Sequence, residues 1–158
     1  SGPARPYAVG RLVLWSLKPE LGRLSLQELP TAAIRKFAIA NPDHAPYGKR
    51  AYEALEHAGV WMAMAPKLVR GEDIGQTFQF VSTGNAELGF VALSQLTPDR
   101  GGSRWLVPTN LHAPIEQQAV LLMPGRYELA ARAFLDFLKS DAARELIERA
   151  GYGVPSQP

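Results

Sequence analysis

Cysteine is absent from the 158 residues, which excludes disulfides and thiolate metal ligands. Long apolar runs are missing too, and no segment approaches the roughly 18 residues that a membrane-spanning helix needs. The formal net charge is only +2, and no basic run is interleaved with aromatic residues, so nucleic acid is not an expected partner. Apolar residues make up 46% of the chain, which is enough to build the core of a globular domain.

The common catalytic and cofactor motifs are also missing. The chain contains no G-x-S-x-G, G-x-x-x-x-G-K-[ST], G-x-G-x-x-G or H-E-x-x-H pattern. Its three histidines, His44, His57 and His112, are too far apart in sequence to form a helical metal pair. We therefore expect a binding protein that is not an enzyme and that uses no cofactor and no metal cation.

Strand and helix patterns alternate along the chain. Apolar runs predict strands over 7–17, 36–40, 67–70, 88–93, 105–107 and 117–123. Amphipathic runs predict helices over 49–58, 74–83, 128–138 and 140–150. This alternation is typical of an α/β fold with a mixed, mostly parallel sheet flanked by helices.

The stretch NPDHAPYG at 41–48 joins the predicted strand over 36–40 to the helix over 49–58. Such a junction places backbone N–H groups at the C-terminal edge of a sheet, where open α/β folds bind ligands. The first N–H groups of a helix lack intrahelical partners, and the macrodipole adds about half a positive charge there. The junction is therefore suited to an oxyanion. A plain strand-to-helix connection has the same pattern, and that alternative stays open.

A second junction of this kind follows the strand over 67–70, and Asp73 is suited to cap the helix that begins after it. His44 beside Asp43 would serve as a general base in an enzyme, and Glu72 with Asp73 as a carboxylate pair. A solvated loop histidine and two carboxylates at a helix start explain the same residues without catalysis.

Several separated motifs resemble the periplasmic molybdate-binding proteins of ABC importers, within the type II periplasmic binding protein family. The motifs are NPDHAPYG at 41–48, LVRGEDI at 68–74, GNAELGFVA at 84–92, FLDFLKS at 134–140 and YG at 152–153. The resemblance implies an oxyanion held between two lobes by backbone N–H groups and hydroxyls, without a metal or a positively charged ligand.

Carried over by position, the resemblance implies that Tyr47 and Ile74 bind molybdate or tungstate through their backbone N–H groups. Some members have a ligand-contacting tyrosine where this chain has Ala92, so that contact is absent here, and a Tyr47 hydroxyl nearby is the alternative source. Backbone donors select mainly by cavity size, which leaves molybdate, tungstate and sulfate open as ligands.

The resemblance also implies a domain organisation. Residues 1–17 form a hinge-crossing strand region, residues 18–115 form lobe two with the oxyanion-binding half, and residues 116–158 form the return crossing and the C-terminal helices of lobe one. The chain resembles a C-terminal part of the family that lacks the N-terminal part of lobe one, so lobe one is expected to be incomplete.

The function implied is that of the periplasmic solute-binding component of an ABC transporter, which closes its lobes on the anion and presents it to a membrane permease. Two alternatives stay open: an effector-binding domain of a transcription regulator, and an enzyme acting on phosphate or carboxylate esters with His44 as base.

The C-terminal helices carry an apolar face at helical spacing, formed by Leu129, Ala133, Phe134, Phe137 and Leu138 and extended by Leu146 and Ile147. We expect this face to pack against another copy of the chain or against a first-lobe segment.

Overall fold

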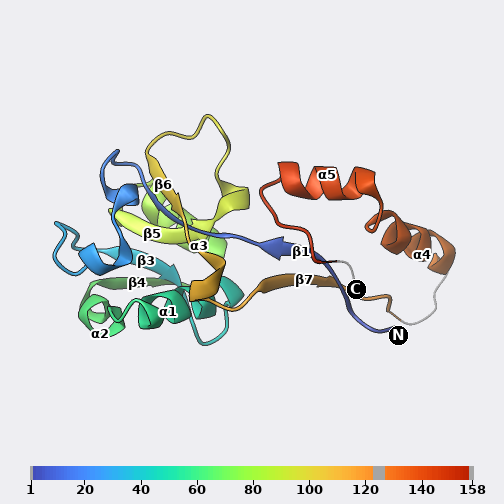
Figure 1. Cartoon of the computed structure of the whole chain (residues 1–158), viewed down its shortest axis with the longest axis horizontal. Coiled ribbons are helices and arrows are strands. Elements are labelled where there is room, and N and C mark those ends of the chain that lie inside the picture. Colours follow the sequence, from blue (N-terminus) through green and yellow to red (C-terminus); the bar gives the residue numbers. More distant parts are fainter. Residues whose placement is uncertain (1, 123–126, 157–158) are drawn as a thin grey trace. The chain divides into compact units, whose positions relative to one another are not determined.

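The computed structural model describes residues 2–122 and 127–156, and these divide into two compact units. The first unit takes both ends of the chain, up to Gly10 and from Pro114 onward, and the second is Arg11–Ala113. Figure 1 shows the elements of each unit.

The second unit carries most of the regular structure. Its strands are β2 (Leu12–Ser16), β3 (Phe37–Ala40), β4 (Leu68–Gly71), β5 (Leu88–Ala92) and β6 (Ser103–Leu106). Its α-helices are α1 (Pro46–His57), α2 (Trp61–Met64) and α3 (Ile74–Ser82). Its 3-10 turns are η1 (Leu21–Arg23), η2 (Leu26–Glu28), η3 (Ala65–Lys67), η4 (Leu93–Gln95) and η5 (Thr109–Leu111).

The five strands form one mixed sheet in the order β4-β3-β5-β2-β6. Strand β3 is parallel to both β4 and β5, whereas β2 is antiparallel to its neighbours β5 and β6. Strand β6 therefore runs in the same direction as β3, β4 and β5. The prediction of a mixed α/β sheet flanked by helices is confirmed.

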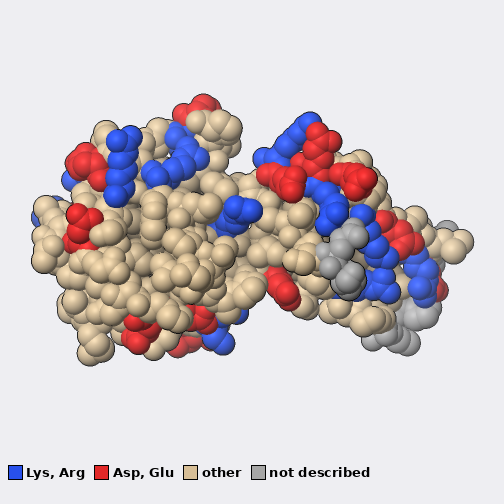
Figure 2. Space-filling model, in the orientation of Figure 1, with Lys and Arg blue, Asp and Glu red and all other residues tan. Residues whose placement is uncertain are grey.

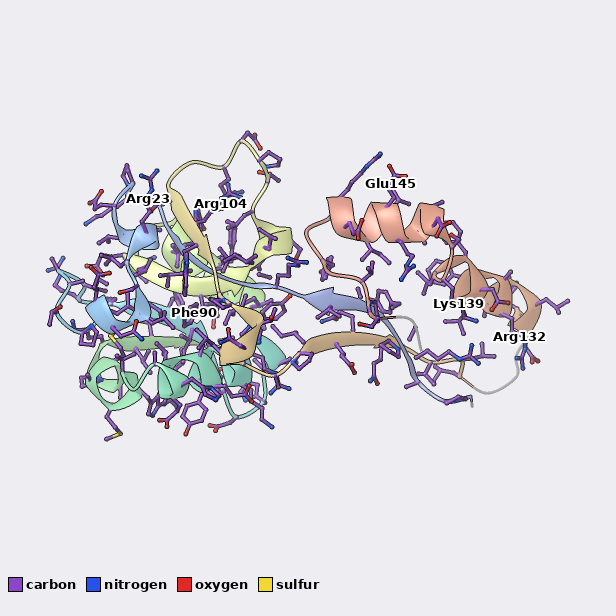
Figure 3. The ribbon with its side chains drawn as sticks, in the orientation of Figure 1. Arg23, Phe90, Arg104, Arg132, Lys139 and Glu145 are labelled. Carbon is purple, nitrogen blue, oxygen red and sulfur yellow. The ribbon has the colours of Figure 1, made fainter. Side chains whose placement is uncertain are left out.

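The three central strands β3, β5 and β2 are buried on both faces, which is why they are almost entirely apolar, whereas the outer strands β4 and β6 each carry an exposed arginine. On one face Trp15, Ala38 and Val91 pack with Val81 of α3, and the Trp15 ring stacks on Phe78 at 5.2 Å between centroids. Alternate residues of the same strands point to the opposite face, where α1 packs against β3. Phe90, labelled in Figure 3, is 1% exposed.

In the first unit, β1 (Arg5–Gly10) pairs antiparallel with β7 (Ile115–Ala119), and the helices α4 (Glu128–Phe137) and α5 (Asp141–Arg149) follow. Val9 also exchanges backbone hydrogen bonds with Gly153, at 2.8 and 2.7 Å. Ser140 caps α5 by accepting from the Ala143 N–H, and Gly151 ends that helix region with a φ of 89°. Arg132 and Lys139 lie along α4 and the turn after it (Figure 3).

Two strand predictions differ from the structure. The strand predicted over 7–17 is two strands interrupted at Arg11, because β1 pairs with β7 whereas β2 pairs with β5 and β6. The strand predicted over 117–123 is β7, which begins two residues earlier and ends at Ala119 opposite Arg5. Val120 and Leu122 are 46% and 74% exposed, and residue 123 lies outside the described residues.

The predicted apolar face of the C-terminal helices is solvent-accessible in the first unit. Leu129 is 85% exposed, Phe134 58%, Phe137 45% and Leu146 57%.

The surface charges are of both signs, and Lys and Arg are interspersed with Asp and Glu on the face shown in Figure 2. No helix among the described residues is long and apolar enough to cross a membrane.

Candidate functional site

The C-terminal ends of β3 and β4 lie side by side at one edge of the five-stranded sheet. Ala40 is the register partner of Gly71, and the Asn41 N–H donates to the Gly71 carbonyl at 2.8 Å. From this edge the chain enters α1 after β3 and α3 after β4. The two helix starts predicted from the sequence therefore follow adjacent parallel strands.

Helix α1 begins with Pro46 at its first position, where the missing N–H costs nothing. Tyr47 and Gly48 follow, and the first helical bond runs from the Lys49 N–H to the Ala45 carbonyl at 3.0 Å. The N-cap residue is Ala45, whose methyl cannot accept a hydrogen bond from the first turn. Helix geometry directs the Tyr47 and Gly48 N–H groups out of this positive end. The Tyr47 side chain itself is buried, at 8% exposed.

Gly48 lets the start of α1 sit directly on the end of β3. A Cβ at this position would lie 2.2 Å from the Ala40 carbonyl oxygen and 2.6 Å from its carbon. No side chain larger than hydrogen fits between the helix and the strand. The glycine thus fixes how closely the Tyr47 backbone approaches the sheet edge.

Helix α3 begins differently, because a carboxylate caps it. Asp73 accepts from the Gln76 N–H at 2.8 Å, as the sequence predicts, and the first helical bond runs from the Thr77 N–H to the Asp73 carbonyl at 3.1 Å. Ile74 occupies the first helical position and Gly75 the second, so within α3 neither N–H has an intrahelical partner. These are the groups that α3 can offer to an anion.

The two connecting loops meet through their side chains. His44 Nε2, from the loop after β3, lies 3.3 Å from Glu72 Oε2, from the loop after β4. Both side chains are open to solvent, at 53% and 78% exposed. An exposed pair of this kind adds little stability, but it shows that the loops preceding Tyr47 and Ile74 are neighbours in space.

A family model described as bacterial extracellular solute-binding protein matches residues 1–153. The chain belongs to this solute-binding family.

Two curated relatives of this solute-binding protein are named as molybdate-binding proteins. The molybdate-binding protein ModA of Rhodobacter capsulatus is 48% identical over 146 residues, which are 92% of this chain and 58% of that protein. ModA of Azotobacter vinelandii is 48% identical over 157 residues, which are 98% of this chain and 62% of that protein. The chain therefore spans only about 60% of the length of these relatives.

Solved structures agree on the fold. The periplasmic molybdate-binding protein of Azotobacter vinelandii superposes with a TM-score of 0.88 at 35% identity, covering 98% of this chain and 69% of that one. The substrate-binding domain of a putative molybdenum ABC transporter from Clostridium difficile gives a TM-score of 0.75 at 25% identity, with 97% and 67% covered.

Tyr47 and Ile74 thus each lie in the first turn of a helix, at junctions that share one sheet edge, and their contact with an anion stays a prediction. In this solute-binding protein Ala92 is the last residue of β5, and it is 2% exposed. Its side chain is a methyl group and cannot supply a hydroxyl to a ligand. What the sequence did not reveal is Gln95, whose side chain joins the Ala92 N–H to the Ile74 carbonyl, both at 3.0 Å. Gln95 can reach both groups only because α3 packs against β5 in the folded chain.

One cavity lies within the first unit. It has a volume of about 680 Å³, and its lining includes Arg5, Tyr7, Leu135, Leu138, Lys139 and Arg144. None of the residues predicted to bind the oxyanion lines it. Among the described residues, no group of three or more His, Cys, Asp or Glu side chains is placed to hold a metal ion.

Proposed function

We propose that this chain binds a tetrahedral oxyanion, molybdate or tungstate, as the ligand-binding part of an ABC importer. The observation that carries the proposal is the placement of the α1 and α3 starts after adjacent parallel strands. Helix N-termini at the C-terminal edge of such strands are favoured anion sites. The molybdate-binding relatives support this choice of ligand.

In the proposed complex, the Tyr47 and Ile74 N–H groups donate to two oxygens of the anion. Both donors are neutral, so they compensate its charge through peptide dipoles and without a metal or cationic side chain. A backbone N–H can donate but cannot accept a hydrogen bond. Such donors suit an anion whose oxygens all accept, whereas the O–H of monohydrogen phosphate needs an acceptor that a backbone N–H cannot supply.

The proposed role is transport, and no chemical step on the ligand is part of it. We place the protein in the periplasm, where it would deliver the anion to a membrane permease after its lobes close, and we assign it no cofactor. The competing functions are an ester-processing enzyme, with His44 as base, and a regulator's effector domain. An enzyme would lose ester turnover in His44→Ala, whereas the transport role predicts no turnover to lose.

The experiment is a titration of the ¹⁵N-labelled 158-residue chain with sodium molybdate, followed by amide NMR at constant ionic strength. This measurement reads individual N–H groups and detects weak binding as well as tight binding. We expect saturable shifts at Tyr47, Gly48, Ile74 and Gly75, reproduced by tungstate and smaller with phosphate. Shifts spread over the chain, or absent from both helix starts, would contradict the proposed function.

A further inference from the structure

Gln95 ties the first residue of α3 to the last residue of β5. Its Oε1 accepts from the Ala92 N–H at 3.0 Å, and its Nε2 donates to the Ile74 carbonyl at 3.0 Å. A peptide N–H can only donate and a peptide carbonyl can only accept, so one orientation of the Gln95 amide satisfies both contacts. The side chain is half-buried at the end of η4, which limits competition from water.

The hydrogen bond from Gln95 is one of two contacts that position the first turn of α3; the other is close packing against Gly71 of β4. Within the start of α3 itself, Thr77 is fully buried and its hydroxyl donates to the carbonyl of the N-cap residue Asp73 at 2.8 Å. Gly71 lies so close that a Cβ there would be 2.5 Å from Thr77 Oγ1. On the β5 side, Gln95 holds the Ile74 carbonyl. The first turn of α3 is therefore packed against β4 and linked through Gln95 to the end of β5.

We propose that Gln95 is a positioning residue for the anion site: by holding Ile74, it sets where the Ile74 N–H meets the ligand. The inference rests on the proposed function. Productive sites hold their groups to within about 0.5 Å, and supporting hydrogen bonds provide that precision. Tetrahedral dianions differ mainly in size, so a fixed Ile74 N–H favours one size. Gln95 thereby contributes to selection of molybdate over the smaller sulfate.

The test compares Gln95→Met with the unsubstituted 158-residue chain in NMR titrations with molybdate and with sulfate. Methionine has similar length but makes neither amide hydrogen bond. We expect molybdate affinity to fall about threefold to tenfold, as for loss of a neutral hydrogen bond. Sulfate affinity falls less, so the preference for molybdate narrows. The molybdate-induced shift of the Ile74 amide shrinks, while the shift at Tyr47 is retained.

Gln95→Glu separates the two hydrogen bonds, because a carboxylate still accepts from Ala92 but cannot donate to Ile74. It is expected to weaken molybdate binding more than Gln95→Met does, since it also adds a negative charge. Gln79→Glu adds the same charge at an exposed position of α3, the helix that Ile74 begins, and serves as the matched control. Its molybdate-to-sulfate preference should be unchanged.

A measurement on the unsubstituted chain keeps the inference testable if a variant fails to fold. A scalar coupling through the hydrogen bond between Gln95 Nε2 and the Ile74 carbonyl should be detectable, and its absence overturns the inference. An unchanged Ile74 response and an unchanged anion preference in folded Gln95→Met overturn it too, with the proposed function intact. No response at Tyr47 or Ile74 in the unsubstituted chain overturns both.

Discussion

His44 Nε2 and Glu72 Oε2 are 3.3 Å apart, although one residue follows β3 and the other follows β4. Each side chain belongs to the loop that leads into one of the two helix starts. Glu72 lies two residues before the start of α3, and its contact with His44 brings its carboxylate to the loop before α1. The charge of Glu72 should therefore oppose an anion that binds between Tyr47 and Ile74.

The first prediction is that Glu72→Gln strengthens molybdate binding. Because Glu72 is exposed, its repulsion is screened by water, and we expect about a twofold to fivefold gain in affinity at low salt. Raising the salt to physiological strength should shrink the gain, since the Debye length falls to about 8 Å. Glu56→Gln, at the other end of α1, is the control and should leave affinity unchanged. Equal affinities for Glu72→Gln and the control would show that the carboxylate does not face the ligand.

The second prediction concerns the close approach of α1 to β3. Alanine usually stabilises a helix relative to glycine by up to about 1 kcal/mol. At Gly48 the sign should reverse, because the added methyl would lie 2.2 Å from the Ala40 oxygen. We expect Gly48→Ala to lower the free energy of unfolding by about 1 to 3 kcal/mol in urea denaturation. Gly101→Ala, where no atom lies within 4 Å of the new Cβ, is the matched control. A Gly48→Ala protein as stable as this control would rule out the packing described for α1.

The third prediction concerns acid stability and rests on Glu53. Burial raises the pKa of Glu53, but the Ala113 N–H, at 2.8 Å, and the Arg50 guanidinium together outweigh burial and lower it below 4.5. A lowered pKa in the folded state stabilises the protein at pH values above 4.5, and that contribution disappears as the pH falls through the lowered pKa. Glu53→Gln should lose stability at neutral pH and depend less on pH below 4.5.

Thermal unfolding of Glu53→Gln between pH 3 and pH 7 measures this effect. At neutral pH we expect a loss of about 1 to 3 kcal/mol, as for a hydrogen bond to a charged group. The exposed Glu56→Gln should follow the parent protein across the range. Parallel pH profiles for Glu53→Gln and the parent would contradict the assignment.

The fourth prediction concerns the apolar face of α4 and α5, which exposes Leu129 and Phe134. Contiguous exposed apolar surface promotes association, so the isolated chain should scatter light as more than one copy at micromolar concentration. A variant with both Leu129→Ser and Phe134→Ser should shift toward the monomer. Leu17→Ser, at an exposed leucine of the other unit, should not. A strictly monomeric parent protein would contradict this prediction.

Local features of the fold follow directly from the sequence. The Asp73 cap of α3 and the left-handed Gly151 after α5 are each determined within a few residues. The Asp73 cap also located the start of α3, whereas α1 begins at Pro46, three residues before the start predicted for it.

Features that depend on pairing across the chain were not predictable. Arg11 separates β1 from β2 only because the two strands have different partners. Gln95 and the contact between His44 and Glu72 need residues far apart in sequence to meet. Neither has a local pattern, since glutamine after a strand or glutamate in a loop is common on any surface. The contacts that support the candidate site could therefore be identified only from the structure.

The most direct test of the proposed anion site is Ile74→Pro. Ile74 is the first residue of α3, where proline is well tolerated, and Asp73 already has the extended backbone, φ −143° and ψ 178°, that proline requires before it. The substitution therefore deletes the N–H while keeping the helix start, and Ile74→Val retains the N–H as the control. Because hydrogen bonds to charged groups contribute about 1.5 to 3 kcal/mol, molybdate affinity should fall about tenfold to a hundredfold in Ile74→Pro and stay unchanged in Ile74→Val. Equal molybdate affinity in a folded Ile74→Pro protein would show that the Ile74 N–H does not bind the anion.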